Sequence, residues 1–165
     1  MQPELPLLGW KEHAALPDLG ITRLRVKLDT GARSSALHVR DIEVVGAHHD
    51  GDQELPVLRF AIVLGRGPDP RTKVVTVASL GLRTVRDTGA KDEVRPVIRT
   101  RVVCGPVDEV TEVTLTDRSG MNFRMILGRA TLERACLVDP GRGYIHSKAP
   151  PRRAAQHVAP SAGAA

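Results

Sequence analysis

The chain has 165 residues, of which 41% are hydrophobic but only 2% aromatic, and its formal net charge is +5. This length fits one domain with a substantial core and is too short for a two-lobed enzyme. A core of Val, Leu, Ile and Ala is rich in β-branched residues, which favours an all-β fold. The basic charge is compatible with an acidic partner. Because the chain has so few aromatic rings on which nucleic-acid bases could stack, direct nucleic-acid binding is disfavoured.

The cellular setting is read from the cysteines and from the first residues. Cys104 and Cys136 lie in separate apolar stretches without the spacing of a metal site, as buried thiols in a reducing compartment would. Residues 1–6 lack the basic start and apolar run of a signal peptide. No apolar stretch approaches the ~18 residues of a membrane span. We therefore expect a cytoplasmic protein that does not contact membranes.

The first strong strand signal ends at a carboxylate. Apolar Leu24, Val26 and Leu28 alternate with the basic residues between them, which predicts a strand with one buried face. This strand delivers Asp29 to an edge of the core. Three small residues then form a narrow turn, in which the glycine lets backbone N–H groups approach the carboxylate closely: Thr30, Gly31 and Ala32.

The remaining elements are also mainly strands. They are expected over residues 36–45, 55–64, 73–86, 94–103, 110–116 and 121–127. A shift in the apolar phase between Val39 and Ile42 predicts a bulge, residues 46–54 a hairpin loop, and residues 117–120 a turn that pairs the last two strands. Residues 129–136 are compatible with a short helix. We place the domain at residues 1–146 and a disordered Ala/Pro/Arg-rich tail at residues 147–165.

Basic side chains gather on the predicted hairpin of residues 73–103. They are Arg83, Arg86, Lys91, Arg95, Arg99 and Arg101. One surface or the tip of this hairpin is therefore expected to be basic, although an ordinary solvated face explains the pattern equally well.

Two distant motifs together follow the plan of an aspartic protease lobe. Leu28-Asp29-Thr30-Gly31-Ala32 is followed far along the chain by Met125-Ile126-Leu127-Gly128-Arg129. Such enzymes activate water between two carboxylates that share one proton. A bare Asp-Thr-Gly is more often a simple turn, but the preceding alternation and the distant Ile-Leu-Gly-Arg favour the lobe. One chain supplies one carboxylate, so the second Asp29 would come from a partner related by a two-fold axis.

The sequence contains a control, because Asp87-Thr88-Gly89-Ala90 repeats the same four letters. The charged Arg86 precedes this copy, where the lobe requires a buried strand residue. We interpret the copy as a hairpin tip rather than as the second half of a site.

Other chemistries find weaker support. His48, His49, Asp50 and Asp52 share one predicted loop, but no zinc-type spacing on a rigid element accompanies them. No phosphate-binding glycine loop occurs, and the serines after the Asp29 turn lack the context of a serine nucleophile. His38 either lines the site or packs as a neutral side chain.

Several motifs together resemble the ATP-dependent zinc protease family, a bacterial group similar to retropepsins. They are Gly9-Trp10-Lys11-Glu12, residues 16–21, residues 27–38, residues 95–100 and residues 123–129. The resemblance runs from about Leu7 to Ile145 and implies a single-lobe, closed retropepsin-like β-barrel with one short helix. The family name claims zinc and ATP, but the sequence shows a site for neither, so no cofactor is expected.

The resemblance also implies roles for individual residues. Asp29 becomes the catalytic carboxylate, with Thr30, Gly31 and Ala32 shaping its turn. Supporting or structural roles fall to Ser34, His38, Gly128 and Arg129. Arg129 is expected to form a structural ion pair.

Family members are associated with ATP-grasp glutamate ligases that add glutamate tails to a ribosomal protein, and the implied activity is removal of those tails by a homodimer. Arg86, Arg95 and Arg99 are then candidates for binding the acidic substrate. Two alternatives stay open. One is a catalytically silent module that binds acidic peptides, and the other is a metal-dependent hydrolase that uses His48 or His49.

Overall fold

A computed structural model describes residues 4–86, 89, 91–117 and 119–148 of the chain. Its strands are β1 (Leu7–Gly9), β2 (Lys11–Leu16), β3 (Ile21–Leu28), β4 (Ser35–Asp50), β5 (Gln53–Leu64), β6 (Arg71–Arg86), β7 (Asp92–Cys104), β8 (Val107–Thr116), β9 (Met125–Leu127) and β10 (Leu137–Asp139). The described helices are the 3-10 turn η1 (Pro17–Leu19) and α1 (Arg129–Leu132). Neither of them has the length of a membrane-spanning helix.

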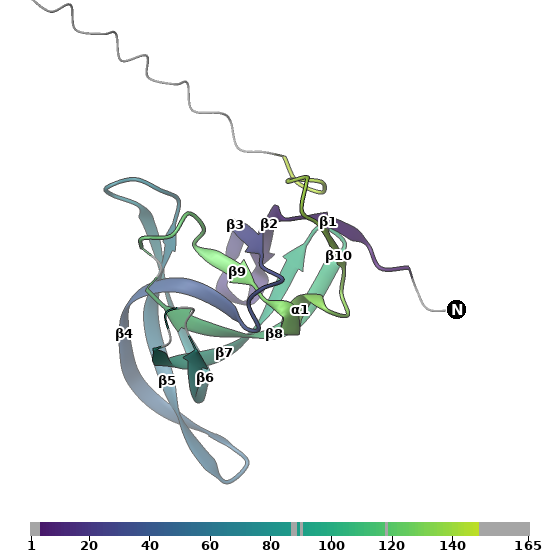
Figure 1. Cartoon of the computed structure of the whole chain (residues 1–165). Coiled ribbons are helices and arrows are strands. Elements are labelled where there is room, and N and C mark those ends of the chain that lie inside the picture. The colour runs from purple at the N-terminus through teal and green to yellow at the C-terminus, as the bar shows by residue number, and fades with distance from the viewer. Residues whose placement is uncertain (1–3, 87–88, 90, 118, 149–165) are drawn as a thin grey trace, which may run out of the picture.

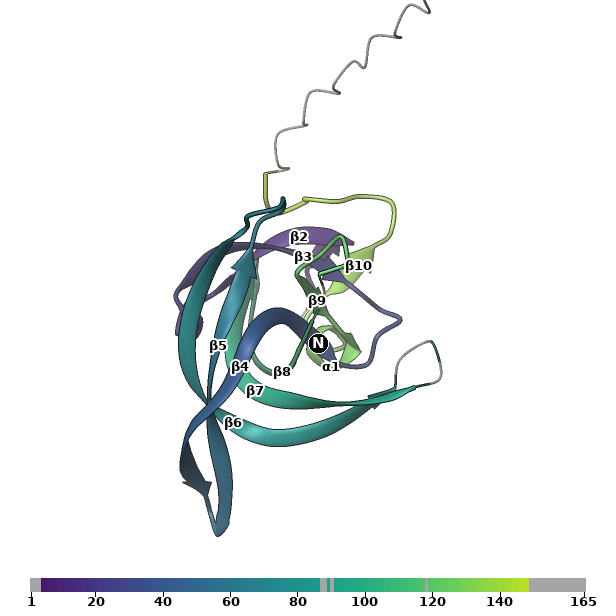
Figure 2. The same ribbon diagram turned by 90° about the vertical axis from the view of Figure 1, so that its left-hand side faces the viewer.

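Eight strands form one sheet in the order β2-β3-β9-β4-β5-β6-β7-β8. Two further pairings, β2 with β7 and β4 with β8, bring its ends together so that the sheet curls into a nearly closed barrel (Figures 1 and 2). The short strands β1 and β10 pair in parallel beside it. The expected all-β fold with one short α-helix is confirmed among the described residues.

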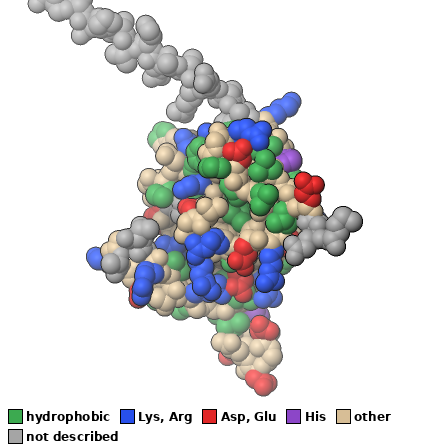
Figure 3. All heavy atoms as spheres, turned by 45° about the vertical axis from the view of Figure 1, so that its right-hand side comes forward, with side chains coloured by type: hydrophobic (Ala, Val, Ile, Leu, Met, Phe, Trp, Pro, Cys, Tyr) green, Lys and Arg blue, Asp and Glu red, His purple; other side chains and the backbone are tan. Residues whose placement is uncertain are grey.

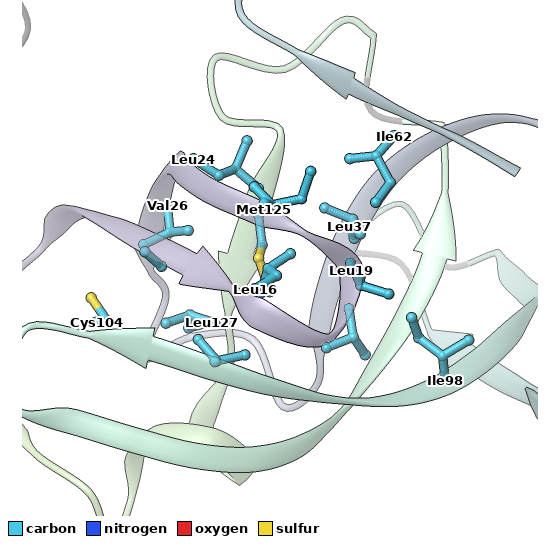
Figure 4. Close-up of a cluster of buried hydrophobic side chains, with 14 of the residues drawn as sticks. Leu16, Leu19, Leu24, Val26, Leu37, Ile62, Ile98, Cys104, Met125 and Leu127 are labelled. Atoms are coloured by element: carbon cyan, nitrogen blue, oxygen red, sulfur yellow. The ribbon is translucent and has the colours of Figure 1, made fainter. Parts of the chain in front are cut away.

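The core is aliphatic, as the composition predicts. Its leucines, isoleucines and valines come from most strands of the barrel and meet at its centre (Figure 4). On β3 the alternation works as expected, because Leu24, Val26 and Leu28 are all buried. Both thiols are also buried and unbonded, and burial raises the pKa of Cys104 to about 12.

Strand β9 corrects the predicted pairing. We expected residues 121–127 to form a hairpin with the preceding strand, but only Met125–Leu127 is a strand, and it does not pair with β8. It lies between β3, to which it is parallel, and β4, to which it is antiparallel. All three of its residues are buried, which is the pattern of a central strand rather than of a hairpin with a wet face.

The hairpin of β4 and β5 is longer than predicted. The loop expected at residues 46–54 is wrong, because the strands continue to Asp50 and from Gln53 and leave a two-residue turn. Gly51 takes a positive φ of 61° there, as tight hairpins require. The predicted bulge is confirmed by the register shift between Arg40 and Glu43. The resulting arm projects from the barrel (Figures 1 and 3).

Helix α1 is shorter than the predicted residues 129–136. The Cys136 N–H still donates to the Leu132 carbonyl, so a further turn of chain follows the helix.

The last described segment lies against β2. Ser147 and Lys148 also hydrogen-bond to the barrel, through Glu12 and Arg23. The domain boundary at residue 146 stays a prediction, and the disorder predicted for the tail concerns residues that lie mostly outside the described ones.

Candidate active site

Asp29 lies where β3 ends and its turn begins. Its backbone N–H donates to the Leu127 carbonyl at 2.8 Å, so neighbouring β9 fixes the start of the turn. The Gly31 and Ala32 N–H groups donate to its Oδ1 at 3.1 and 3.2 Å. A Cβ on Gly31 would lie 3.3 Å from that same oxygen, so a larger residue would crowd the carboxylate. The turn therefore holds one carboxylate oxygen with backbone donors.

The second oxygen faces a cation. Lys27 Nζ lies 3.2 Å from Asp29 Oδ2, and the side chain of Asp29 stays 25% exposed. Burial acts to raise the pKa of Asp29, but the Lys27 ammonium and the two backbone donors outweigh it and lower that pKa. Within one chain the carboxylate is therefore anionic at neutral pH.

Helix α1 braces the turn from behind. The Arg129 and Ala130 N–H groups donate to the carbonyls of Ala32 and Arg33 at 2.8 and 3.0 Å. The Arg129 guanidinium does not enter an ion pair among the described residues, which corrects our expectation. It donates instead to the carbonyls of Thr30 and Gly31, at 3.3 and 3.2 Å. A fork of N–H donors suits two adjacent carbonyls as well as a carboxylate.

Gly128 allows the helix to approach the turn this closely. A Cβ built on Gly128 would lie 2.6 Å from the carbonyl carbon and oxygen of Ser34. Next to this contact, a chain of hydroxyls ties the helix to the sheet. Ser35 Oγ accepts from the Gly128 N–H at 3.0 Å and lies 2.7 Å from Thr131 Oγ1. Thr131 Oγ1 also lies 2.8 Å from Thr111 Oγ1 on β8.

His38 is fully buried on β4, away from the contacts of the turn. Its Nδ1 lies 3.4 Å from Asp117 Oδ1, and its backbone N–H donates to the Arg124 carbonyl at 2.7 Å. Burial lowers the pKa of its imidazole, with Arg124 adding to the effect and Asp117 opposing it. Neither Asp117 nor Arg124 belongs to the Asp29 turn.

The arginines proposed for substrate binding lie on the β6–β7 hairpin, where carboxylates accompany them. Arg86 pairs with Asp92 at 3.6 Å, Arg95 with Glu93 at 2.6 Å, and Arg99 with Glu112 at 3.9 Å. Ion pairs also hold Arg83 and Arg101. Much of the positive charge expected on this hairpin is therefore neutralised locally.

Two further sequence hypotheses have mixed outcomes. Most of the repeat at residues 87–90 lies outside the described residues, although Arg86 and Asp92 pair across the two strands that lead to it. His48 and His49 belong to β4 rather than to a loop, and His48 Nε2 contacts the Ser79 carbonyl at 2.7 Å. Within the described part of the chain, no three His, Cys, Asp or Glu residues gather as metal ligands would.

Lys27 was not predicted from the sequence as a partner of the Asp29 carboxylate. Its place two residues before Asp29 was a usable signal, because residues i and i+2 of a strand lie on one face. Ser34 was predicted to support the site, whereas the side chain that holds helix α1 is that of Ser35. Nothing in the sequence distinguishes the two serines until the pairing of β4 is known.

Comparison with known proteins now adds to this geometry. Residues 7–149 match the RimB-like family, described as "Retropepsin-like aspartic endopeptidase RimB". This chain belongs to the RimB-like family. The resemblance to retropepsins is thereby confirmed, while nothing in the match or the described site supports dependence on zinc or ATP.

Curated relatives carry a different name. A "Probable alpha-L-glutamate ligase" of Parasynechococcus marenigrum is 34% identical over 136 residues, covering 81% of this chain and 28% of that protein. Proteins of the same name from Desulfotalea psychrophila and Shewanella pealeana are 27% and 28% identical, with 81% and 84% of this chain covered and 28% and 29% of theirs. The chain thus spans less than a third of these relatives.

A solved structure has the same fold. A Legionella pneumophila protein of unknown function superimposes with a TM-score of 0.65 at 26% identity. The match covers 86% of this chain and 98% of the Legionella chain.

Proposed function

We propose that the protein is an aspartic peptidase that works as a homodimer, with one Asp29 from each copy on either side of a lytic water. The observation that carries the proposal is the Asp29 turn itself. Its carboxylate is partly exposed, is held by the Gly31 and Ala32 N–H groups, and is braced by Arg129 from the helix. Fixed placement of a reactive carboxylate is what general acid–base catalysis requires.

A second carboxylate is needed for the chemistry. One anionic Asp29 can take a proton from water, but the carbonyl oxygen of the substrate must also receive one. Two carboxylates a few ångström apart cannot both ionise, so the pair retains one proton and supplies both functions. The recorded partners of Asp29 within one chain are Lys27, Gly31 and Ala32, none of which is a carboxylate. A second copy supplies the missing group.

The outer side of the turn is open for such a copy. Thr30, Gly31 and Arg33 are exposed, while Ser35 and the rest of the support behind them are buried. Two-fold symmetry would place the same exposed residues of both copies against each other. Lys27 would then face two carboxylates instead of one.

The proposed substrate is a peptide rich in glutamate, such as the acidic tail of a ribosomal protein. The net charge of +5 and the naming of the relatives as glutamate ligases support this choice. A glutamate ligase is also the proposed functional partner, since it would make the chain that this protein removes.

Replacing Asp29 with Asn tests the proposal. Asn keeps the size of the side chain and an oxygen for the Gly31 and Ala32 donors, but it cannot exchange a proton. The rate of cleavage of a glutamate-tailed peptide, determined from the masses of the products, should fall by at least about 100-fold. Sedimentation should show the dimer unchanged.

The matched control is Asp50→Asn, which makes the same chemical change on the exposed arm. This control should cleave like the wild type. Equal cleavage by Asp29→Asn and the wild type would refute the role of Asp29, and a strictly monomeric active protein would refute the shared site.

One observation favours a second candidate function. The matched region occupies only 28% to 29% of relatives that are named ligases, so the domain also occurs in proteins named for making, rather than cutting, a bond. A silent module that binds acidic peptides is consistent with this finding. Binding of a glutamate-tailed peptide by the wild type with no change in its mass would support the module over the peptidase.

A further inference from the structure

A hollow of the surface lies at the opposite end of β3 from Asp29. Its volume is about 350 Å³, and the first half of β3, the β5–β6 connection and the residues before β9 line it. The described residues that line it include six cationic side chains and no Asp or Glu. The cations are Arg23, Arg25, Arg66, Arg71, Lys73 and Arg124. We call this hollow the basic pocket.

Neutral carbonyl groups hold several of these cations in place. Lys73 Nζ donates to the Gly20 carbonyl at 2.8 Å, and Arg124 Nε donates to the Gly65 carbonyl at 3.1 Å. Arg23 donates to the carbonyl of Lys148. Such bonds orient a cation without cancelling its charge, so the field in the hollow stays positive.

The β6–β7 hairpin differs in this respect. Its arginines pair with Glu93, Asp92 and Glu112. In contrast, Arg23 and Arg71 of the basic pocket occur in none of the ion pairs among the described residues. The basic pocket is therefore the better site for an anion, although the sequence pointed to the hairpin.

The neighbouring His13 reports this positive field. Burial lowers the pKa of its imidazole, and Arg23 and Arg25 lower it further, against a smaller opposing effect of Glu12. The His13 ring stacks on Tyr144, which also accepts a hydrogen bond from Arg25 at 3.1 Å. An anion bound beside these arginines would oppose their effect on the pKa of His13.

The basic pocket is connected to the catalytic turn by one face of β3. Arg23, Arg25 and Lys27 alternate with buried residues, so they share the face that ends at Asp29. At a rise of about 3.3 Å per residue, Arg23 lies about 20 Å from Asp29 along the strand. An extended peptide would need about six residues to reach from one to the other.

We propose that the basic pocket binds side-chain carboxylates of an acidic peptide about six residues away from the bond that Asp29 cleaves. The direction toward Asp29 rests on the proposed peptidase function, whereas binding in the pocket does not. The pocket would then favour long acidic tails over short ones, because only a long tail reaches both ends of β3.

Binding is measured without cleavage, in protein that carries Asp29→Asn. Fluorescence anisotropy follows a labelled peptide of ten glutamates as protein is added. The pocket variant combines Arg23→Gln with Arg71→Gln, and the matched control combines Arg40→Gln with Arg59→Gln on β4 and β5. Both remove two positive charges from exposed positions. The pocket variant should bind about tenfold more weakly, and the control as the parent does.

Several results would overturn the proposal. These are no binding by the parent protein, an equal loss in both variants, or a loss confined to a hairpin variant that combines Arg86→Gln with Arg99→Gln. Tighter binding of a single-stranded oligonucleotide of equal charge, with the same loss in the pocket variant, would assign the pocket to nucleic acid instead. Arg71→Gln alone serves as a second variant, because among the described residues the Arg71 side chain makes no hydrogen bond whose loss could disturb the fold.

Cleavage then tests the link between the pocket and Asp29. In protein with Asp29 intact, the pocket variant should raise KM for a ten-glutamate tail about tenfold and leave kcat unchanged. A three-glutamate peptide is too short to span the distance, so its KM should stay the same. Equal KM changes for both lengths would refute the spanning geometry. If the wild type bound the ten-glutamate peptide but did not cleave it, the peptidase function would be refuted and the proposal for the basic pocket would stand.

Discussion

Two carboxylates on adjacent strands, Glu12 on β2 and Asp29 at the end of β3, show how similar local bonding serves different ends. Both accept backbone N–H donors and both have a lowered pKa. Glu12 is fully buried, whereas Asp29 keeps a quarter of its side chain exposed. The fold thus buries the Glu12 carboxylate and leaves the Asp29 carboxylate accessible to solvent.

Glu12 is saturated with donors. Its Oε1 accepts from the N–H groups of Gly9 at 3.0 Å and Ile145 at 2.7 Å, and from that of His146 at 3.3 Å. Its Oε2 accepts from the Ser147 hydroxyl at 2.6 Å. These bonds tie both ends of the described chain to β2. The Glu12 carboxylate has no exposed surface and is structural. Among the described residues, Asp29 Oδ2 contacts Lys27 alone, and it can exchange this partner for water or substrate.

Glu12→Ala should have the largest effect on stability. It leaves the buried N–H group of Gly9 and the partly buried N–H group of Ile145 without an acceptor, and the free energy of unfolding should fall by about 3 kcal/mol. Urea unfolding measures this loss. Glu12→Gln keeps an acceptor and should lose less, whereas Asp29→Asn should unfold like the wild type. An Asp29→Asn variant as unstable as Glu12→Ala would contradict this distinction between the two carboxylates.

Gly128→Ala should have the next largest effect, by moving the support of Asp29 rather than the carboxylate. The added Cβ would lie 2.6 Å from the Ser34 backbone, and overpacking of this kind costs about 1–3 kcal/mol. Cleavage should fall with stability, because the helix that carries Arg129 is displaced from the turn. Gly120→Ala, with open space at its Cβ, is the control that should change neither.

The Glu12 carboxylate should also make stability depend on pH. Its buried position acts to raise its pKa, but the Ser147 hydroxyl and three backbone donors lower it overall. A pKa that is lower in the folded state adds stability above the ordinary Glu pKa, about 4.3, and this stability is lost as the pH falls through the folded value. Thermal unfolding of the wild type and of Glu12→Gln between pH 7 and pH 3 should therefore converge in acid. A constant difference between them would contradict the assignment.

Lys27→Met should have the smallest effect, and it acts on Asp29 alone. The ammonium group lowers the pKa of Asp29, so its removal should raise that pKa. The acid limb of the pH profile of kcat/KM should then move to higher pH, because the carboxylate must be ionised to act as a base. Lys11→Met, on the residue opposite Lys27 in β2, is the control. Identical acid limbs in the two variants would show that Lys27 does not tune the site.

Local patterns in the sequence determined the parts of this protein that depend on neighbours in the chain. The alternation of Leu24, Val26 and Leu28 gave β3 its buried face, and Gly31 gave the carboxylate its backbone donors. The bulge near Asp41 followed from a shift in the same period. The inward place of Glu12 was also readable, because it shares the face of Ala14 and Leu16, but a buried carboxylate gives no sign of its partners.

The pairing of distant segments could not be read from the sequence and is known only from the folded structure. Residues 125–127 could have paired with β8, and the insertion of β9 between β3 and β4 places Gly128 and the helix behind the Asp29 turn. The same folding sets the β5–β6 connection beside the start of β3 and so forms the basic pocket, while carboxylates on β7 and β8 neutralise the hairpin arginines. Charge can be counted along a sequence. Its effect depends on which side chains share a surface, and that is set by contacts between residues far apart in the chain.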